Sequence, residues 1–285
     1  MSDLLVKTRE ICRLFEIKPA RSKGQNFLIN EKIYDDVITA ADLKPEDIIL
    51  EVGPGLGFLT AKLAARVKQV IAVELDDKLA AYLQTGVDAQ GVENVAIVNG
   101  DILSFDIARH LPPNASHYKV VANLPYNITS FFLRRFLSQD SRPDSLVLML
   151  QKEVAERIVA RPPAMSLLAA SVQYYASPEI IRTVKAGNFW PEPAVDSAII
   201  KIVSHQSQRD SQTKEEDKDF FRLVRIGFSA KRKMLKNNLA AGLKLEPSNL
   251  NDLLTRQGFD PRVRAEDLSV QDWRKLFAAL RLFMV

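Results

Sequence analysis

Residues 47–60 read Asp-Ile-Ile-Leu-Glu-Val-Gly-Pro-Gly-Leu-Gly-Phe-Leu-Thr. The first half is a short apolar run typical of a buried strand, and residues 57–66 have the pattern of a following helix. Gly53, Gly55 and Gly57 allow a tight turn and let a ligand lie against the main chain. A strand, a glycine-rich turn and a helix in this order indicate either a site for a nucleotide-like ligand or a purely structural turn.

Strand-like and helical stretches alternate along the first two-thirds of the chain. The helix after the second strand is predicted to bury Leu75, Leu79 and Leu83 on one face. Strands alternating with helices argue for an α/β fold, a parallel sheet with helices on both faces. The further strands are predicted at 70–74, 95–99, 119–122, 145–150, 180–185 and 195–203, with a helix at 129–137 among those between them.

The last third of the chain has a different pattern. Residues 204–218 are polar without apolar periodicity, which predicts a linker. Only helical patterns follow, at 220–227, 232–239, 247–257 and 269–282, with Ser248 and Ser269 as candidate N-caps. The expected organisation is a first domain over 1–203, a linker over 204–218 and a small all-helical domain over 219–285.

The basic surplus of the chain is confined to this last third. The formal net charge is +4, yet residues 1–203 hold 23 Lys and Arg against 24 Asp and Glu. Residues 204–285 hold 16 Lys and Arg against 11 Asp and Glu. A stripe of Lys and Arg residues within this basic region would predict contacts with nucleic-acid phosphates. The alternative is that these residues form the solvated face of an amphipathic helix. The candidate phosphate-binding residues are Arg222, Arg225, Lys231, Arg232, Lys233 and Lys236, which lie in a segment without acidic residues.

Composition excludes several other classes of protein. No apolar run approaches the roughly 18–20 residues of a membrane-spanning helix, and the first residues lack the apolar centre of a signal peptide. The single cysteine, Cys12, excludes an internal disulfide and a cysteine-based zinc site. We therefore expect a cytoplasmic protein without a metal, and nothing in the sequence demands an oligomer.

The glycine spacing narrows the choice of ligand. The dinucleotide fingerprint needs its third glycine one residue later than Gly57, where a helix N-terminus packs against a pyrophosphate. A ligand without a pyrophosphate, such as S-adenosylmethionine, does not need that arrangement. Glu74, at the end of the second strand, can accept hydrogen bonds from both ribose hydroxyls of either ligand.

A second loop, Asn123-Leu-Pro-Tyr126, ends the predicted fourth strand. The Asn123 amide oxygen and the Leu124 carbonyl can each accept a hydrogen bond from an exocyclic amine, and Tyr126 offers a ring on which a base can stack. Together they suit an adenine amine that attacks a methyl sulfonium, a reaction that needs no general base. The simpler alternative is a proline turn after a strand.

With these motifs, the chain resembles the KsgA-type small-subunit ribosomal RNA adenine dimethyltransferases. The resemblance runs from residue 25 nearly to the C-terminus. Its motifs are QNFL at 25–28, EVGPGLGFLT at 51–60, VELD at 73–76, GDIL at 100–103, NLPY at 123–126, QKEVAERI at 151–158, F-x-P-x-P-x-V-x-S at 189–197 and FSAKRKMLKNNL at 228–239.

This resemblance implies a Rossmann-like S-adenosylmethionine-dependent methyltransferase. It would dimethylate two adjacent adenines near the 3′ end of 16S rRNA, within the small subunit or its precursor, during subunit biogenesis. Phe189 would stack on the target base opposite Tyr126, and the helical domain would hold the rRNA. The implied cofactor-binding residues are Asn26, Leu28, Gly53, Gly55, Gly57, Glu74, Asp101, Ile102 and Asn123.

Three alternatives stay open at this stage. The first is the related large-subunit rRNA methylase that confers macrolide resistance, although the 228–239 motif resembles the small-subunit branch better. The second is a non-enzymatic factor of the same fold, acting in ribosome assembly or transcription, which the intact glycine loop and acceptor loop disfavour. The third is methylation of a small molecule, which the basic helical tail disfavours.

Overall fold

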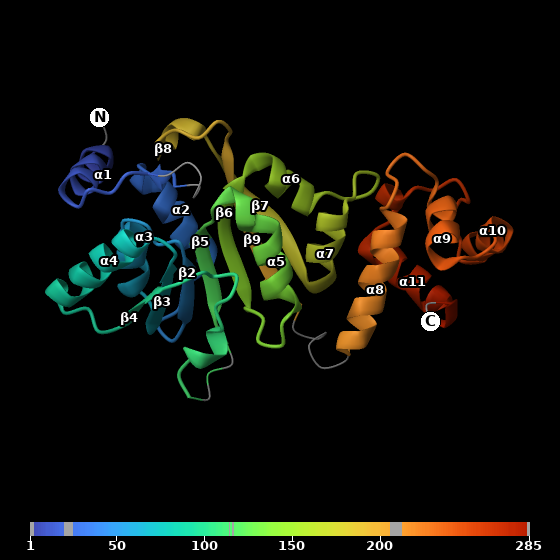
Figure 1. Ribbon diagram of the computed structural model, residues 1–285, viewed down its shortest axis with the longest axis horizontal. Helices are drawn as coiled ribbons and strands as arrows, with labels where there is room; N and C mark the ends of the chain where they lie inside the picture. The colour runs from blue at the N-terminus through green and yellow to red at the C-terminus, as the bar shows by residue number, and fades with distance from the viewer. Residues whose placement is uncertain (1–2, 20–24, 114, 116, 206–212, 284–285) are drawn as a thin grey trace. The chain divides into compact units, whose positions relative to one another are not determined.

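The structure is a computed structural model that describes residues 3–19, 25–113, 115, 117–205 and 213–283 (Figure 1). The chain divides into two compact units. The first comprises Met1–Ala155 and Pro178–Ser204, and the second comprises Glu156–Ser177 and His205–Val285.

The first unit is built on a seven-stranded sheet with the order β4-β3-β2-β5-β6-β9-β7. Apolar runs form its central strands, and β2 is buried along its whole length. The strands from β2 to β6 pair in parallel. Their bounds are β2 (Ile48–Val52), β3 (Gln69–Glu74), β4 (Val95–Asn99), β5 (Lys119–Asn123), β6 (Ser145–Gln151), β7 (Ala176–Val184) and β9 (Ser197–Ser204).

The predicted parallel pairing holds for strands β2 to β6, and one further strand departs from it. Strand β9 runs antiparallel to β6, with Ser145 opposite Val203 and Gln151 opposite Ser197. Apolar runs of five to eight residues are typical of buried strands in either direction, so the sequence pattern alone does not fix this orientation. The sheet is therefore mixed, while the predicted α/β architecture is confirmed.

Helices cover both faces of this sheet, and α5 lies in front of it in Figure 1. Helix α4 starts at Asp77, after the Asp76 carboxylate caps it, and buries Leu79 and Leu83. Leu75 precedes the helix and is 58% exposed, so its predicted place on the buried face is wrong. The helices of the first unit are α1 (Asp3–Leu14), α2 (Glu31–Ala41), α3 (Phe58–Ala64), α4 (Asp77–Gln90) and α5 (Thr129–Ser138), and the boundary between the units falls within α6 (Lys152–Val159).

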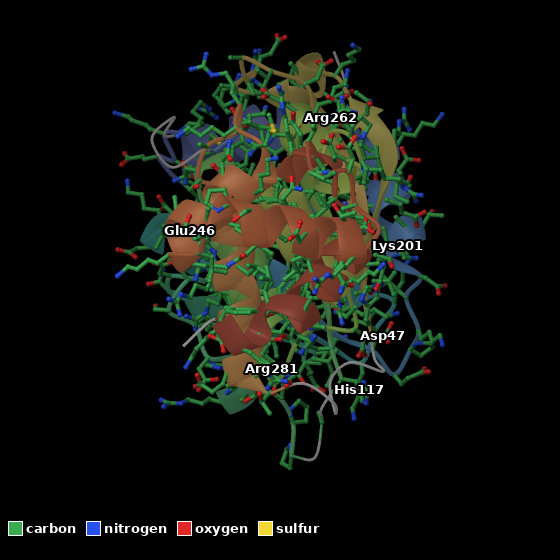
Figure 2. The ribbon with its side chains drawn as sticks, turned by 90° about the vertical axis from the view of Figure 1, so that its right-hand side faces the viewer. Asp47, His117, Lys201, Glu246, Arg262 and Arg281 are labelled. Atoms are coloured by element: carbon green, nitrogen blue, oxygen red, sulfur yellow. The ribbon has the colours of Figure 1, made fainter. Side chains whose placement is uncertain are left out.

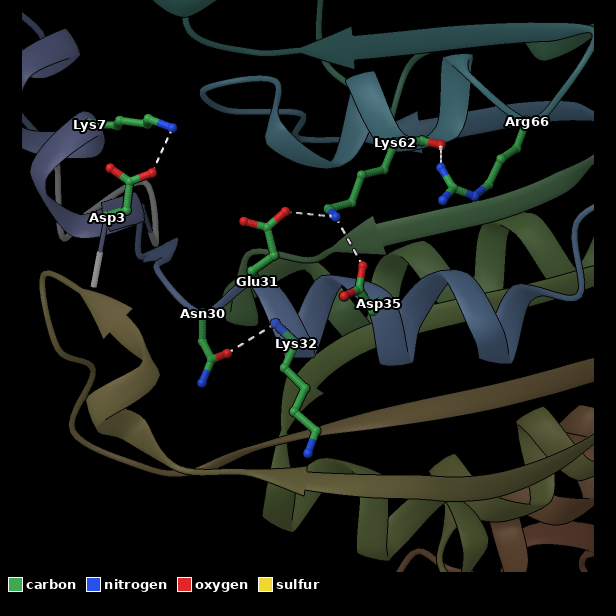
Figure 3. A network of polar contacts seen from close by, with 8 residues as sticks. All are labelled: Asp3, Lys7, Asn30, Glu31, Lys32, Asp35, Lys62 and Arg66. Atoms are coloured by element: carbon green, nitrogen blue, oxygen red, sulfur yellow. Dashed lines mark hydrogen bonds and ion pairs between the residues drawn. The ribbon is translucent and has the colours of Figure 1, made fainter. Parts of the chain in front are cut away.

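Helices α2 and α3 are joined by both apolar and ionic contacts. Ile33, Val37 and Leu63 belong to one buried cluster that includes Ile49 of the central strand. On the exposed side, Lys62 of α3 pairs with Glu31 at 2.8 Å and with Asp35 at 2.9 Å, both on α2 (Figure 3). The buried cluster supplies most of the stability here, because exposed ion pairs contribute little.

A small two-stranded sheet adds the N-terminal segment to this unit. Strand β1 (Phe27–Leu28) pairs antiparallel with β8 (Phe189–Trp190), so that Phe27 lies opposite Trp190. The Tyr34 hydroxyl of α2 donates a hydrogen bond of 3.1 Å to the Leu28 carbonyl. The short motif at 25–28 is thus held against the body of the unit. No helix in the described part of the chain is both long enough and apolar enough to span a membrane.

The second unit is helical, as predicted, but it begins earlier than the linker prediction allows. Helix α8 starts at Lys214, where Thr213 and Glu216 form a capping box. Residues 214–218 are therefore helical, and residues 206–212 of the predicted linker lie outside the described residues. The helices of this unit are α7 (Leu167–Tyr175), α8 (Lys214–Gly227), α9 (Leu235–Leu243), α10 (Pro247–Arg256) and α11 (Val270–Leu280).

The second unit also takes in residues 156–177, which the sequence assigned to the first domain. The cause is aromatic packing of α7 on α8. The rings of Tyr174 and Phe220 stack with 4.3 Å between centroids, and the hydroxyls of Tyr174 and Tyr175 both donate to Asp217. These contacts join segments about 40 residues apart, which periodicity along the chain does not reveal.

Helix capping in this unit bears out one of two predictions. Ser269 caps α11 by accepting a hydrogen bond from the Asp272 amide. Ser248 is not a cap, since α10 starts at Pro247 with Glu246 as its N-cap residue. Proline at the first helical position has no amide to satisfy and already has the helical φ, which places the start of α10 one residue before Ser248.

Candidate functional site

The chain changes direction across the sheet at the carboxyl end of β2. Strands β3 and β4 follow on one side of β2, whereas β5 and β6 lie on the other. Ligands of open α/β sheets bind in the crevice at such a switch point. A cavity of about 210 Å³ lies there, bounded by the residues that follow β2, β3, β4 and β5.

This cavity brings together most of the predicted cofactor-binding residues, which arrive from five separate segments of the first unit. Gly57, Leu124, Tyr126 and Phe189 are not among the residues that line it. The predicted residues that do line it are Asn26, Leu28, Gly53, Gly55, Glu74, Asp101, Ile102 and Asn123.

The glycine turn divides into a ligand-facing part and a structural part. Gly55 lines the cavity with φ +59°, and a Cβ there would come within 3.3 Å of the Phe27 ring. Gly57 has φ +78° and is the N-cap residue of α3, and a Cβ there would lie 2.7 Å from Leu83. Gly57 thus permits close packing of the turn on α4. The sequence predicted Gly57 as a cofactor-binding residue, but it does not line the cavity.

Glu74 is fixed at the end of β3 by backbone amides. Its Oε2 accepts from Gly55 N at 3.1 Å, and its Oε1 accepts from Asp76 N at 2.9 Å. Burial raises the pKa of this carboxyl, while the two amides act in the opposite direction. Each carboxylate oxygen has further lone pairs, so Glu74 can still accept two hydroxyl donors from a ligand in the cavity.

Asp101 and Ile102 follow β4 at the next position along the sheet. The Asp101 carboxylate accepts a hydrogen bond from Leu103 N at 2.8 Å, and Asp101 remains exposed. Ile102 is buried and contributes an apolar wall to the cavity. An acceptor beside an apolar surface suits the edge and face of a purine ring.

Asn123 links the acceptor loop to the N-terminal segment. Its Nδ2 donates a hydrogen bond of 3.3 Å to the backbone carbonyl of Asn26. This donation orients the amide so that Oδ1 is left as an acceptor. A hydrogen-bond acceptor is therefore held in a fixed orientation at the carboxyl end of β5.

The rest of the acceptor loop is anchored on the neighbouring strands. The Leu124 amide donates to the Met149 carbonyl at 3.0 Å, and the Leu124 residue is only 2% exposed. The Tyr126 hydroxyl lies 2.7 Å from Ser197 Oγ on β9, and burial raises the pKa of this hydroxyl. The ring of Tyr126, half-buried, is thereby held beside the loop.

Phe189 lies in a different environment from the predicted one. It is 3% exposed and belongs to the core cluster that also contains Leu28 and Tyr34. Because Phe189 pairs with Leu28 in the small sheet, the Phe189 ring lies in this core. The structure therefore does not present Phe189 as a free face for a base, in contrast to the sequence prediction. Trp190 packs against the neighbouring cluster.

Sequence reasoning missed Glu51, a buried carboxyl in the wall of the cavity. Glu51 is 1% exposed, and its Oε2 has no hydrogen-bond partner among the described residues. Burial raises the pKa of Glu51 to about 8, with a further increase from Glu74. The available signal was an acidic residue inside an otherwise apolar strand, since a buried charge has to be paired or neutralised.

The predicted basic residues lie on two elements of the second unit. Arg222 and Arg225 are on α8, and Lys231, Arg232 and Lys233 occupy the turn before α9. All five are exposed, whereas Lys236 is partly buried and donates to Asn251 Oδ1 at 3.0 Å. Within the described part of the chain, Arg225 and the three basic residues of the turn pair with no carboxylate.

Other arginines of this unit are already paired. Arg262 lies 2.9 Å from Asp260, and Arg281 lies 2.8 Å from Glu216. The two arginines are also far apart in the view of Figure 2. In the described part of this unit, the turn at 231–233 therefore differs from these arginines, because its three adjacent cations are exposed and pair with no carboxylate.

The first unit has a mixed seven-stranded sheet with a cavity at its switch point. A glycine turn follows the central strand, and acidic residues follow the next two strands. This combination defines a Rossmann-like methyltransferase. The model of the family described as ribosomal RNA adenine dimethylase matches residues 18–281. The chain belongs to this family, which confirms the resemblance drawn from its motifs.

Relatives and solved structures agree with this assignment. The chain is 44% identical to a ribosomal RNA small subunit methyltransferase A of Dehalococcoides mccartyi, over 96% of this chain and 92% of that protein. It is 38% identical to the protein of that name from Clostridium botulinum, over 95% of this chain and 97% of that protein.

Two solved structures resemble the fold over nearly the whole chain. A dimethyladenosine transferase from Plasmodium falciparum has a TM-score of 0.78 at 28% identity, covering 91% of this chain and 98% of that one. The 23S rRNA methyltransferase ErmE has a TM-score of 0.72 at 25% identity, covering 90% and 100%. The similarity therefore includes both units.

Proposed function

We propose that this chain transfers methyl groups from S-adenosylmethionine to the exocyclic amines of two adjacent adenines near the 3′ end of small-subunit rRNA. The observation that carries the proposal is the single cavity in which Glu74, Asp101 and Asn123 meet at the ends of neighbouring strands. Family membership and the relatives named above support the choice of substrate.

The residues of the cavity fit S-adenosylmethionine. Glu74 would hold the ribose hydroxyls, and Asp101 and Ile102 would hold the adenine. The buried Oε2 of Glu51 has no partner among the described residues, so a ligand that brings positive charge into the cavity would pair with this carboxyl and favour its ionised form. Asn26, Leu28, Gly53 and Gly55 would enclose the remainder of the molecule.

When bound, the cofactor supplies an electrophilic methyl group on a sulfonium. The chain's own contribution is to bind and orient the amine that attacks it. Asn123 Oδ1 and the Leu124 carbonyl accept hydrogen bonds from the two amine hydrogens, which turns the nitrogen lone pair away from the base ring. Because both acceptors are preorganised by the contacts to Asn26 and Met149, little reorganisation accompanies the reaction.

The target base has to leave its stack to reach these acceptors. Tyr126 provides a ring for it, held in place by the hydrogen bond to Ser197. No side chain acts as a general base, because the methylated amine is an acidic ammonium that loses its proton to water. The catalytic residues in this proposal are Asn123, Leu124 and Tyr126.

The second unit binds the rRNA phosphates through the basic turn at 231–233, with Arg222, Arg225 and Lys236 beside it in sequence. Hydrogen bonds from a buried side chain hold this turn in place. Asn238, which is buried, donates to the Gly227 carbonyl at 2.6 Å and to the Ala230 carbonyl at 3.1 Å. The support fixes the turn and leaves its cations exposed for phosphates.

The partner of this reaction is the small ribosomal subunit or its precursor, so the proposed place of action is the cytoplasm. A monomer suffices, because all residues of the cavity come from the first unit of one chain. Similarity to a 23S rRNA methyltransferase favours large-subunit rRNA as the second candidate substrate.

Primer extension on treated ribosomal subunits tests this function. Small subunits from a strain lacking the modification are incubated with the protein and S-adenosylmethionine, and large subunits serve as the parallel substrate. New stops at two adjacent adenines of small-subunit rRNA alone are expected. Stops confined to large-subunit rRNA would favour the second candidate, and unmodified RNA with the cofactor bound would refute both.

A further inference from the structure

An exposed aromatic ring lies next to the acceptor loop. Phe131 of α5 is 60% exposed, which makes it the most exposed of the described phenylalanines. Its helix neighbours Phe132 and Phe136 are completely buried. Solvent exposure of so large an apolar side chain has an unfavourable free energy, so Phe131 is a candidate for contact with a partner.

A guanidinium accompanies this ring. Arg134 lies one helical turn further on, and its Cζ is 5.7 Å from the centroid of Phe131. Arg134 is exposed and pairs with no carboxylate among the residues that the structure describes. The adjacent Arg135 differs, because it turns inward and donates to the Phe105 carbonyl at 2.9 Å. Arg134 alone of this pair is available to an anion.

The ring and the guanidinium follow closely in sequence on residues that line the cavity. Asn127 is exposed and lines the cavity, and it precedes Phe131 by four residues and Arg134 by seven. Phe131 and Arg134 are three residues apart on α5 and therefore lie on one face of that helix. At about 1.5–2 Å of rise per residue, Phe131 is about 8–10 Å along the chain from Tyr126. A nucleotide next to the one at Tyr126 lies within this range.

We propose that Phe131 and Arg134 form a binding site for the unpaired nucleotide that neighbours the target adenosine. The base stacks on Phe131, and the guanidinium of Arg134 contacts a backbone phosphate. This inference rests on the proposed function and specifies how the substrate strand is held beside the cavity. Stacking on an aromatic ring tolerates any base, so the site positions the strand and does not select its sequence.

Charge and chemistry favour RNA as the occupant. A ring with an adjacent, unpaired guanidinium matches an alternation of base and phosphate. An apolar protein partner would leave Arg134 without a counter-charge. The site also follows the acceptor loop closely in sequence and belongs to the same unit, whereas the basic turn at 231–233 belongs to the other unit.

The test is the affinity for a fluorescent single-stranded RNA that carries two adjacent adenines, measured by anisotropy. Phe131→Ala is expected to weaken binding by about tenfold, since one stacked base contributes about 1–3 kcal/mol. Phe131→Trp is expected to retain the affinity of the parent chain. Arg134→Ala is expected to lower the salt dependence of binding by about 0.7 in the log–log slope. Phe15→Ala is the matched control, at an exposed phenylalanine that directly follows α1 and does not line the cavity.

A second readout separates positioning from catalysis. With small subunits as substrate, Phe131→Ala should raise KM by a similar factor and leave kcat within about twofold. An RNA affinity and a KM within twofold of the parent values would overturn the proposal. Because the binding measurement needs no methyl transfer, a loss of affinity would support this site even if the parent chain methylated no rRNA, an outcome that would refute only the proposed function.

Discussion

The side-chain amide of Asn123 donates a hydrogen bond of 3.3 Å to the backbone carbonyl oxygen of Asn26, joining segments that are 97 residues apart. The contact unites the strand that carries the acceptor loop with the N-terminal segment that closes one side of the cavity. A single residue thereby orients the acceptor for the target amine and contacts the wall of the cofactor site. Asn123 is the residue on which methyl transfer depends most.

Replacing Asn123 by alanine should slow methyl transfer strongly. Loss of one preorganised polar partner of a transition state costs about 3 kcal/mol, or roughly a hundredfold in rate. Single-turnover methylation of small subunits measures this rate, and calorimetry measures the cofactor affinity in parallel. Asn249→Ala, at an exposed asparagine of α10, is the control. Full activity of the Asn123 variant would show that the amine is activated by other groups.

Two substitutions of Tyr126 distinguish its ring from its hydroxyl. Tyr126→Ala should lower kcat/KM by about tenfold or more, because a stacked base loses about 1–3 kcal/mol of binding. Tyr126→Phe keeps the ring and removes only the hydrogen bond to Ser197, so kcat/KM should stay within about threefold. If the two variants were equally impaired, the hydroxyl and not the stacking surface would be the important group.

The buried carboxyl of Glu51 should make stability depend on pH. Burial raises its pKa from 4.5 to about 8 in the folded chain. Between these pH values the unfolded chain has lost the proton that the folded chain retains, so the free energy of unfolding falls as pH rises. One pKa unit corresponds to about 1.4 kcal/mol, and the total effect is several kcal/mol.

Urea unfolding at pH 5 and pH 8 measures this effect, with Glu51→Gln as the reference because glutamine does not titrate. The stability of the parent chain relative to the variant should fall by several kcal/mol from pH 5 to pH 8. An equal difference between the two proteins at both pH values would mean that Glu51 is ionised, and paired, in the folded chain.

The basic turn should govern RNA affinity and its salt dependence. Changing Lys231, Arg232 and Lys233 together to alanine removes up to three phosphate contacts, each of which contributes about 0.7–0.9 to the log–log slope against salt. Binding of rRNA at several salt concentrations should show a slope lower by about 2–3 and a weaker affinity. Lys218→Ala, where the lysine pairs with Glu215, should change neither value. An unchanged slope in the triple variant would make the turn a solvated surface only.

Much of the catalytic unit could be predicted from the sequence because its signals are local. A buried strand, a glycine turn and a helix follow one another within residues 47–66, and the acidic Glu74 ends the next strand. The carboxyl ends of parallel strands meet at one edge of the sheet, so residues distant in sequence converge there without further information. The cavity accordingly contains eight of the predicted residues.

The errors arise where the structure depends on contacts across the chain. Helix α7 belongs to the second unit because Tyr174 stacks on Phe220, a pairing that periodicity does not reveal. Phe189 is buried because β8 pairs with β1, two strands of two residues each. Glu51 lies within an apolar run, which the sequence pattern identifies as a buried strand without indicating a role for its one charged residue. The start of α8 was missed because the capping residues Thr213 and Glu216 lie in a polar stretch that resembles a linker.

The measurement that tests the central claim most directly is nucleoside mass spectrometry of small-subunit rRNA after reaction with the protein and S-adenosylmethionine. Subunits lacking the modification should gain N6,N6-dimethyladenosine at two adjacent positions near the 3′ end, four methyl groups in all, and the Asn123→Ala variant should add them much more slowly. Methyl groups on another base or another atom, or a parent chain that binds the cofactor and leaves the rRNA unchanged, would contradict the account.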